Sequence, residues 1–148
     1  MDAKFIREYF LAKYELRFHQ RYLTRSTSAD FAMLNRIKTK YGEDVTLEAI
    51  DNFLSVIPFN KATINFFSTG SVFESLFNVL IKLSPIIRYR RLLSKYSPEL
   101  HAKMKSLIDE YTDYTLAMYP STEELIRKTI ILKELETLDA ERFRRSIN

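Results

Sequence analysis

The sequence contains no cysteine, two glycines and four prolines among its 148 residues. Without cysteine, the chain forms no disulfide and offers no thiolate ligand to zinc or to an iron–sulfur cluster. The two glycines, Gly42 and Gly70, are too far apart to build the glycine-rich loops that bind dinucleotides or nucleoside triphosphates. Tight β-hairpins also usually need glycine. The composition therefore argues against a β-rich fold and against a nucleotide-binding enzyme.

Long apolar runs are also missing. No segment approaches the roughly 20 apolar residues that span a bilayer, and the most apolar one, residues 72–83, is interrupted by Glu74, Asn78 and Lys82. The first eight residues carry charges of both signs and lack the apolar stretch of a signal peptide. We therefore expect no membrane partner and a cytoplasmic location, which would be the host cytoplasm if a phage encodes the protein.

The size and balance of the chain are those of a small globular protein. A chain of 17.6 kDa buries about 69% of its unfolded surface on folding, which is enough for a hydrophobic core. Hydrophobic residues make up 46% of the sequence and charged residues 28%. This balance is typical of folded rather than disordered chains. We predict a single helical domain over residues 1–148.

Signals for helices recur along the chain. Aromatic and apolar residues at every fourth position from Ile6 to Tyr22 predict a first long helix. Gly42 and Pro58 predict helix ends, and Ser97 followed by Pro98 predicts a helix start. The fold class is therefore all-α, a compact bundle of six or seven helices. The predicted helices cover residues 5–23, 28–41, 44–57, 71–83, 84–96 and 97–119, and a last one that begins near 120. Residues 59–70 lack a clear pattern, and a short β-hairpin there is the alternative.

Positive charge is concentrated in the middle of the chain. The net charge is +4, and no acidic residue lies between Glu74 and Glu99. Arginine binds phosphate through paired N–H groups, and aromatic rings stack on bases. If the helix continues, Arg88, Arg91 and Lys95 share one of its faces, with Tyr89 or Tyr96 placed to stack. A solvated face that pairs with acidic residues is the alternative. The predicted nucleic-acid-binding residues are Lys82, Arg88, Tyr89, Arg90, Arg91 and Lys95.

A second basic group follows the first predicted helix. Arg17, Arg21 and Arg25 are spaced by four residues and share a face if that helix continues. The hydroxyl-rich loop over residues 24–28 precedes a helix N-terminus, where anions bind favourably. A cationic cap on the helix dipole is the alternative explanation. This secondary basic patch is a further candidate for anion contact.

Phe66 and Phe67 form a candidate site for a protein partner. A simple amphipathic face cannot bury two adjacent apolar side chains, so at least one of them could lie on the surface. A role in the core, or in anchoring a loop, is the alternative.

Catalytic signals are weak. The chain has two histidines, His19 and His101, far apart in sequence. Asp109 and Asp113 lie one helical turn apart and could hold Mg²⁺, but such pairs more often form a solvated face. No signature of a serine hydrolase, a zinc protease or a kinase is present. We predict a protein that is not an enzyme and has neither a cofactor nor a metal site.

One region resembles a known class of proteins. It combines Phe10, Tyr14, Phe18 and Tyr22 at four-residue spacing, a polar loop, Asp30 and Leu34, Tyr41 and Gly42, and then Leu47, Ile50, Asp51 and Phe53. This pattern resembles the small helical domain of phage-type replication accessory proteins and helicase loaders, over residues 5–83. The resemblance implies a role in bringing replication or transcription machinery to DNA, and it transfers no catalytic residue.

These observations lead to one hypothesis and one alternative. The hypothesis is a non-enzymatic helical accessory protein that binds nucleic acid and a larger protein machine, such as a helicase or a polymerase. The alternative is a protein-interaction adaptor or inhibitor of a larger enzyme that binds no nucleic acid. The oligomeric state and the choice between DNA and RNA are open at this point.

Overall fold

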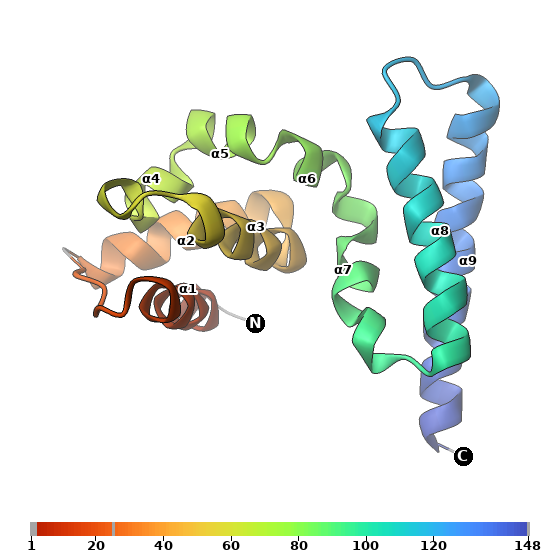
Figure 1. Ribbon diagram of the computed structural model, residues 1–148, viewed down its shortest axis with the longest axis horizontal. Helices are drawn as coiled ribbons and strands as arrows, with labels where there is room; N and C mark the ends of the chain where they lie inside the picture. The colour runs from red at the N-terminus through yellow and green to blue at the C-terminus, as the bar shows by residue number, and fades with distance from the viewer. Residues whose placement is uncertain (1–2, 25, 148) are drawn as a thin grey trace. The chain divides into compact units, whose positions relative to one another are not determined.

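The computed structural model describes residues 3–24 and 26–147, with side chains described as far as residue 141. Within these residues the fold is all-α, as predicted, with nine α-helices, two short 3₁₀ turns and no strand (Figure 1). The predicted number of six or seven helices is close to this. The helices are α1 (Ala3–Phe18), α2 (Thr27–Tyr41), α3 (Glu43–Val56), α4 (Ile64–Ser68), α5 (Gly70–Leu76), α6 (Asn78–Lys82), α7 (Ser84–Leu92), α8 (Pro98–Leu116) and α9 (Thr122–Ile147). The 3₁₀ turns are η1 (Phe59–Lys61) and η2 (Leu93–Lys95).

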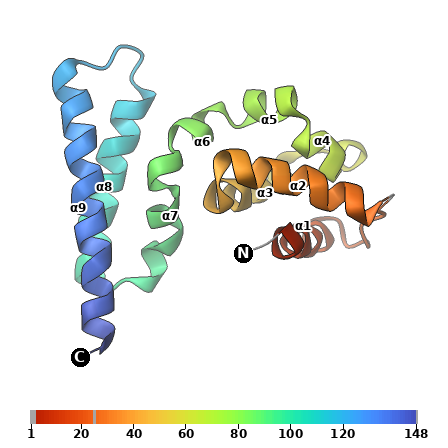
Figure 2. The same ribbon diagram turned by 180° about the vertical axis from the view of Figure 1, so that it is seen from behind.

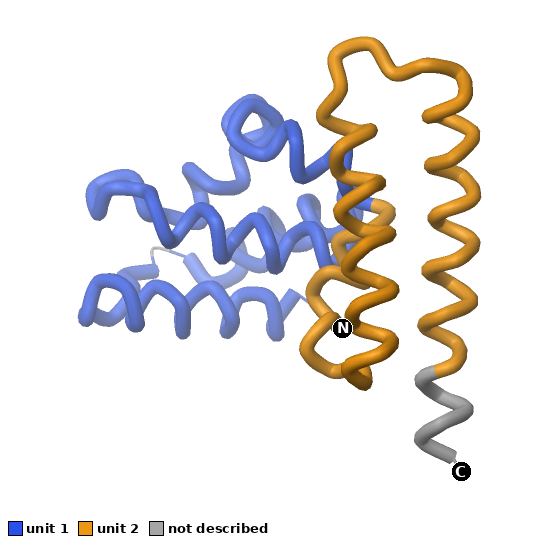
Figure 3. Tube along the Cα trace, turned by 45° about the vertical axis from the view of Figure 1, so that its right-hand side comes forward, with its two compact units in different colours: residues 1–84 blue, residues 85–148 orange. Residues whose placement is uncertain are grey.

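The chain divides into two compact units (Figure 3). Unit 1 is Met1–Ser84 and unit 2 is Pro85–Asn148. This division does not decide whether the two units fold together, so the single domain over residues 1–148 stays a prediction. In the described part of the chain, no helix has the length and apolar character that a membrane crossing requires.

Unit 1 has an aromatic core. Helices α1, α2 and α3 pack against one another, and α4 packs against α2. The side chain of Phe67 is fully buried at the centre of this core. Its ring centroid lies 5.2 Å from that of Phe53, 5.4 Å from that of Phe73 and 6.1 Å from that of Phe10. Tilted and edge-to-face pairs at such distances add stabilisation beyond the burial of apolar area.

Helix α1 is shorter than the sequence pattern predicts. It ends at Phe18 because His19 takes a positive φ of 56°, which breaks the helical backbone. Tyr22 lies beyond this break, yet its ring centroid is 5.5 Å from that of Phe10 and 5.1 Å from that of Tyr14. The backbone N–H of Ile64 donates to the Tyr22 hydroxyl at 2.9 Å. Tyr22 thus joins the aromatic core from a loop, so the four-residue spacing does not mark a continuous helix.

Residues 59–70 form the turn η1, the helix α4 and short connecting residues, and contain no strand. The turn η1 is followed by α4, and the Thr63 side chain caps α4 by accepting a hydrogen bond from the Phe66 N–H at 3.0 Å. The alternative of a β-hairpin is therefore wrong for this segment. A threonine cap and one buried helical turn satisfy its backbone without a partner strand.

Unit 2 is built from α7, α8 and α9, and α8 and α9 run antiparallel side by side (Figures 1 and 2). The predicted start of α8 is confirmed, since the Ser97 hydroxyl accepts a hydrogen bond from the Leu100 N–H at 3.4 Å and Pro98 opens the helix. The core of unit 2 is largely aliphatic. Its most buried side chains include Ile86, Ile87, Leu100, Met104, Ile131 and Leu135.

Candidate nucleic-acid interface

Most of the predicted nucleic-acid-binding residues lie in α7 and η2 of unit 2. Arg88 and Lys95 are exposed, whereas Tyr89, Arg90 and Arg91 are partly exposed. Lys82 is also exposed, but it ends α6 in unit 1. We use the term α7 basic surface for the four cations of α7 and η2, which are Arg88, Arg90, Arg91 and Lys95.

The ends of this surface are fixed by buried residues. Ile86 and Ile87 hold the start of α7 in the core, and Tyr96, which follows η2, is only 7% exposed. Because α7 ends at Leu92 and continues as a tighter 3₁₀ turn, Lys95 does not share a continuous helix face with Arg88. The predicted common face is therefore wrong in its detail, although the cations stay within eight residues of one another.

The two tyrosines of this segment have different environments. The Tyr96 hydroxyl donates a 2.7 Å hydrogen bond to the Asp139 carboxylate, so Tyr96 belongs to the core and cannot stack on a base. Tyr89 is half-buried. Burial raises the pKa of its hydroxyl, and the carboxylates of Asp139 and Glu136 raise it further. Acidic residues of α9 thus lie near α7, a proximity that the sequence order does not reveal.

The secondary basic patch does not form as predicted. Arg17 lies in the last turn of α1, and its guanidinium donates to the backbone carbonyls of Leu54 and Ile57, the latter at 3.1 Å. Arg21 lies beyond the end of the helix and is exposed, so it does not share a helix face with Arg17. Arg25 lies outside the described residues. Arg17 satisfies carbonyls at the end of α3, which is a structural role.

An ion pair that the sequence does not signal joins α1 to the first turn of α2. The Arg7 guanidinium lies 3.3 Å from the Asp30 carboxylate and donates to the Thr24 hydroxyl at 2.8 Å. Asp30 is 6% exposed, and its negative charge sits in the first turn of α2. This carboxylate competes with any external anion at that helix N-terminus. Arg7 and Asp30 are 23 positions apart in the sequence, and no local pattern pairs them.

The predicted partner-binding pair is divided between core and surface. Phe67 is fully buried and cannot contact a partner, so the prediction is wrong for this residue. Phe66 is half-buried, and its ring stacks on that of Phe53 with centroids 6.2 Å apart. The alternative of a core role holds for Phe67, because α4 turns one of the two adjacent side chains directly inward.

The residues considered for catalysis have ordinary contacts. The His101 imidazole Nδ1 lies 2.8 Å from the Leu93 carbonyl oxygen. The Asp109 carboxylate accepts a 2.8 Å hydrogen bond from the Lys105 ammonium. Among the residues that the structure describes, no group of three or more histidine or acidic side chains could hold a metal ion. The predictions of no enzyme and no metal stay predictions.

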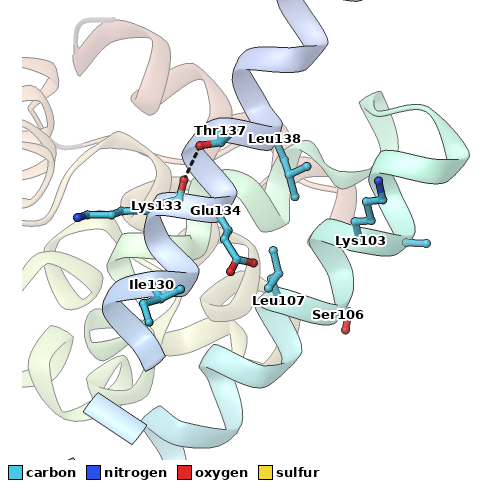
Figure 4. Close-up of a pocket in the computed structure, with 9 residues that line it drawn as sticks. Lys103, Ser106, Leu107, Ile130, Lys133, Glu134, Thr137 and Leu138 are labelled. Carbon is cyan, nitrogen blue, oxygen red and sulfur yellow. Dashed lines mark hydrogen bonds between the residues drawn. The ribbon is translucent and has the colours of Figure 1, made fainter. Parts of the chain in front are cut away.

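A groove between α8 and α9 is a feature that the sequence analysis missed (Figure 4). It encloses about 730 Å³ and is lined on the α8 side by Ala102, Lys103 and Leu107 and on the α9 side by Ile130, Glu134 and Leu138. Leu107, Glu134 and Leu138 point into the space between the two helices. No local sequence pattern marks this groove, because its walls come from two helices that are separate in the sequence.

Beside this groove, α8 and α9 are joined by a bidentate ion pair. The Arg127 guanidinium lies 2.7 and 3.1 Å from the two carboxylate oxygens of Glu110, and a third hydrogen bond comes from the Tyr114 hydroxyl at 2.8 Å. This pairing lowers the pKa of Glu110 and raises that of Arg127. Bidentate arginine–carboxylate pairs hold a fixed geometry, so the two helices are kept in register here.

Comparison of the chain with protein-family models, with curated proteins and with solved structures finds no match.

Proposed function

We propose that this chain is a non-enzymatic accessory protein that contacts the phosphates of a nucleic acid through the α7 basic surface. One observation carries the proposal. Arg88 and Lys95 are exposed, and in the described part of the chain neither forms an ion pair. Both lie in a segment without any acidic residue from 75 to 98. Exposed cations of this kind attract a polyanion, and each phosphate that they neutralise releases counterions.

The size of the surface predicts modest affinity. Two to four phosphate contacts correspond to a slope of about −2 to −4 in a plot of log K against log salt for duplex DNA. Binding should therefore weaken strongly when salt rises from low to physiological concentration. A surface this small would act together with other contacts, which supports an accessory role beside a larger machine. The replication or transcription context comes from the sequence resemblance and is part of the proposal.

The test is a titration of labelled single- and double-stranded oligonucleotides, read by fluorescence anisotropy at several salt concentrations. Arg88→Glu combined with Lys95→Glu should weaken binding at least about tenfold and make the salt slope shallower by about two. The control combines Lys4→Glu with Lys61→Glu, two exposed lysines of unit 1, and makes the same change in net charge. Equal losses in both double variants would show a non-specific effect of net charge and would refute the site.

The second candidate is an adaptor or inhibitor that docks its basic surface on an acidic protein. One observation favours it: Arg17 is engaged inside the fold, so fewer basic side chains are available for phosphate contact than the sequence predicts. In this case the wild-type chain would bind neither kind of oligonucleotide at low salt. Arg88→Glu with Lys95→Glu would then abolish capture of the partner protein instead.

A further inference from the structure

We propose that the α8–α9 groove binds a second copy of this chain, which packs its own α8 and α9 against it about a two-fold axis. This contact does not depend on whether α7 binds nucleic acid. The first support is apolar surface. Ile130 is 43% exposed on the wall of the groove, and Ile126, one turn earlier on α9, is 57% exposed. Together with the partly exposed Leu138 these side chains form an apolar strip, and a partner that covers the strip would remove it from water.

The charges beside this strip point to the occupant. Lys103 on α8 and Glu134 on α9 line opposite walls of the same groove. Lys103 forms no ion pair in the described part of the chain, and Glu134 has its partner Arg127 at 3.3 Å and a side chain that is half exposed. Glu134 would repel a strongly acidic partner, and Lys103 would repel a strongly basic one. A second copy can instead place its Glu134 against Lys103 and its Lys103 against Glu134.

Two-fold symmetry turns these two charges into two ion pairs. In such a contact, a residue i of one copy meets residue j of the other, and j meets i in return. Lys103 of each copy then faces Glu134 of its partner copy, while the apolar strips meet at the centre. Two antiparallel helix pairs packed in this way form a four-helix arrangement, which is a common means of burying a second apolar stripe.

The size of the face fits a weak, reversible contact. Helix α8 has 19 residues and is therefore about 28 Å long, and two helices about 10 Å apart present a face about 20 Å wide. This is an area of about 560 Å² before the relief of the side chains is included, and a stable interface takes roughly 800 Å² from each partner. We therefore expect an association in the micromolar range.

The first test is analytical ultracentrifugation of the full chain over a range of concentrations. The proposal predicts a reversible monomer–dimer equilibrium. A chain that stays monomeric at about 1 mM, the Kd of a very weak complex, would overturn it. Ile130→Asp should raise the dimer Kd at least tenfold, because it places a carboxylate in the apolar strip. Leu23→Asp, at an exposed apolar residue of unit 1, is the control and should leave the Kd unchanged.

The second test is a charge exchange that only a second copy can satisfy. Lys103→Glu alone and Glu134→Lys alone should each weaken self-association about tenfold, since each variant brings like charges together. An equal mixture of the two variants should form a heterodimer, because every facing pair is then attractive. The double variant should recover self-association. If dimers form but the mixture does not pair, Lys103 and Glu134 do not face each other and the proposal fails.

Discussion

In unit 1 the clustered aromatic and basic side chains pack or form hydrogen bonds inside the fold. In unit 2 several of the clustered basic side chains remain on the surface. The rings of Phe10, Phe53 and Phe67 lie against one another in unit 1, and Arg17 binds backbone carbonyls there. In unit 2 the core is largely aliphatic, and Arg88 and Lys95 remain exposed. A basic or aromatic cluster in a sequence therefore indicates function only where its side chains are not already engaged in packing or hydrogen bonds within the fold.

The largest expected effect comes from removing the centre of the aromatic core. Phe67→Ala should cost about 3–5 kcal/mol of unfolding free energy, because it leaves a cavity among four other phenyl rings. Denaturant unfolding followed by circular dichroism measures the loss. Phe59→Ala, at a ring that is 52% exposed, should cost about 1 kcal/mol or less.

The same variant tests the division into two units. Hydrogen exchange of Phe67→Ala should show a larger loss of amide protection in α1, α3 and α4 than in α8 and α9. An equal loss in both units would show that they unfold together. That result would support the predicted single domain and would contradict a separate stability of the two units.

A smaller effect is expected in unit 2. Tyr96→Phe removes the hydroxyl that donates to the buried Asp139 carboxylate and should cost about 1.5–3 kcal/mol. Tyr114→Phe is the matched control, since the Tyr114 hydroxyl donates to the Glu110 carboxylate nearer to solvent. It should cost less than about 1 kcal/mol. Thermal or urea unfolding of both variants compares them. Equal losses of stability in the two variants would show that burial does not make the Tyr96–Asp139 hydrogen bond more stabilising.

The smallest expected change in stability distinguishes Arg17, which has a structural role, from Arg88, which we propose binds nucleic acid. Arg17→Met should lower stability by about 1 kcal/mol, through the carbonyls of α3 that lose their donor, and leave oligonucleotide affinity within about twofold. Arg88→Met should do the reverse, with unchanged stability and weaker binding. A fall in affinity for Arg17→Met as large as that for Arg88→Met would contradict the structural role of Arg17.

The sequence predicted what local signals determine. Gly42 ends α2 with a φ of 92° and an N–H that donates to the Lys38 carbonyl at 2.8 Å, as its position indicates. The start of α8 at Ser97 and Pro98 was equally predictable, and so was the all-α class. Each of these features depends on residues within one or two turns of each other.

The sequence could not predict features that depend on distant contacts. His19 ends α1 although the apolar spacing continues to Tyr22, because a loop returns Tyr22 to the same core. The pairing of Arg7 with Asp30 and the use of Arg17 by α3 both join separate elements. The α8–α9 groove likewise appears only when two helices lie side by side. The four-residue spacing of the arginines alone therefore predicted a secondary basic patch that does not form as predicted.

Amide chemical-shift mapping of the full chain during titration with an oligonucleotide tests the central claim most directly. The account predicts that the largest shifts fall in residues 84–95, over α7 and η2, and that the residues around Arg17 and Arg21 change little. Shifts that gather around Arg17 and Arg21, or no shifts at low salt, would contradict the claim that the exposed cations of unit 2 bind nucleic acid.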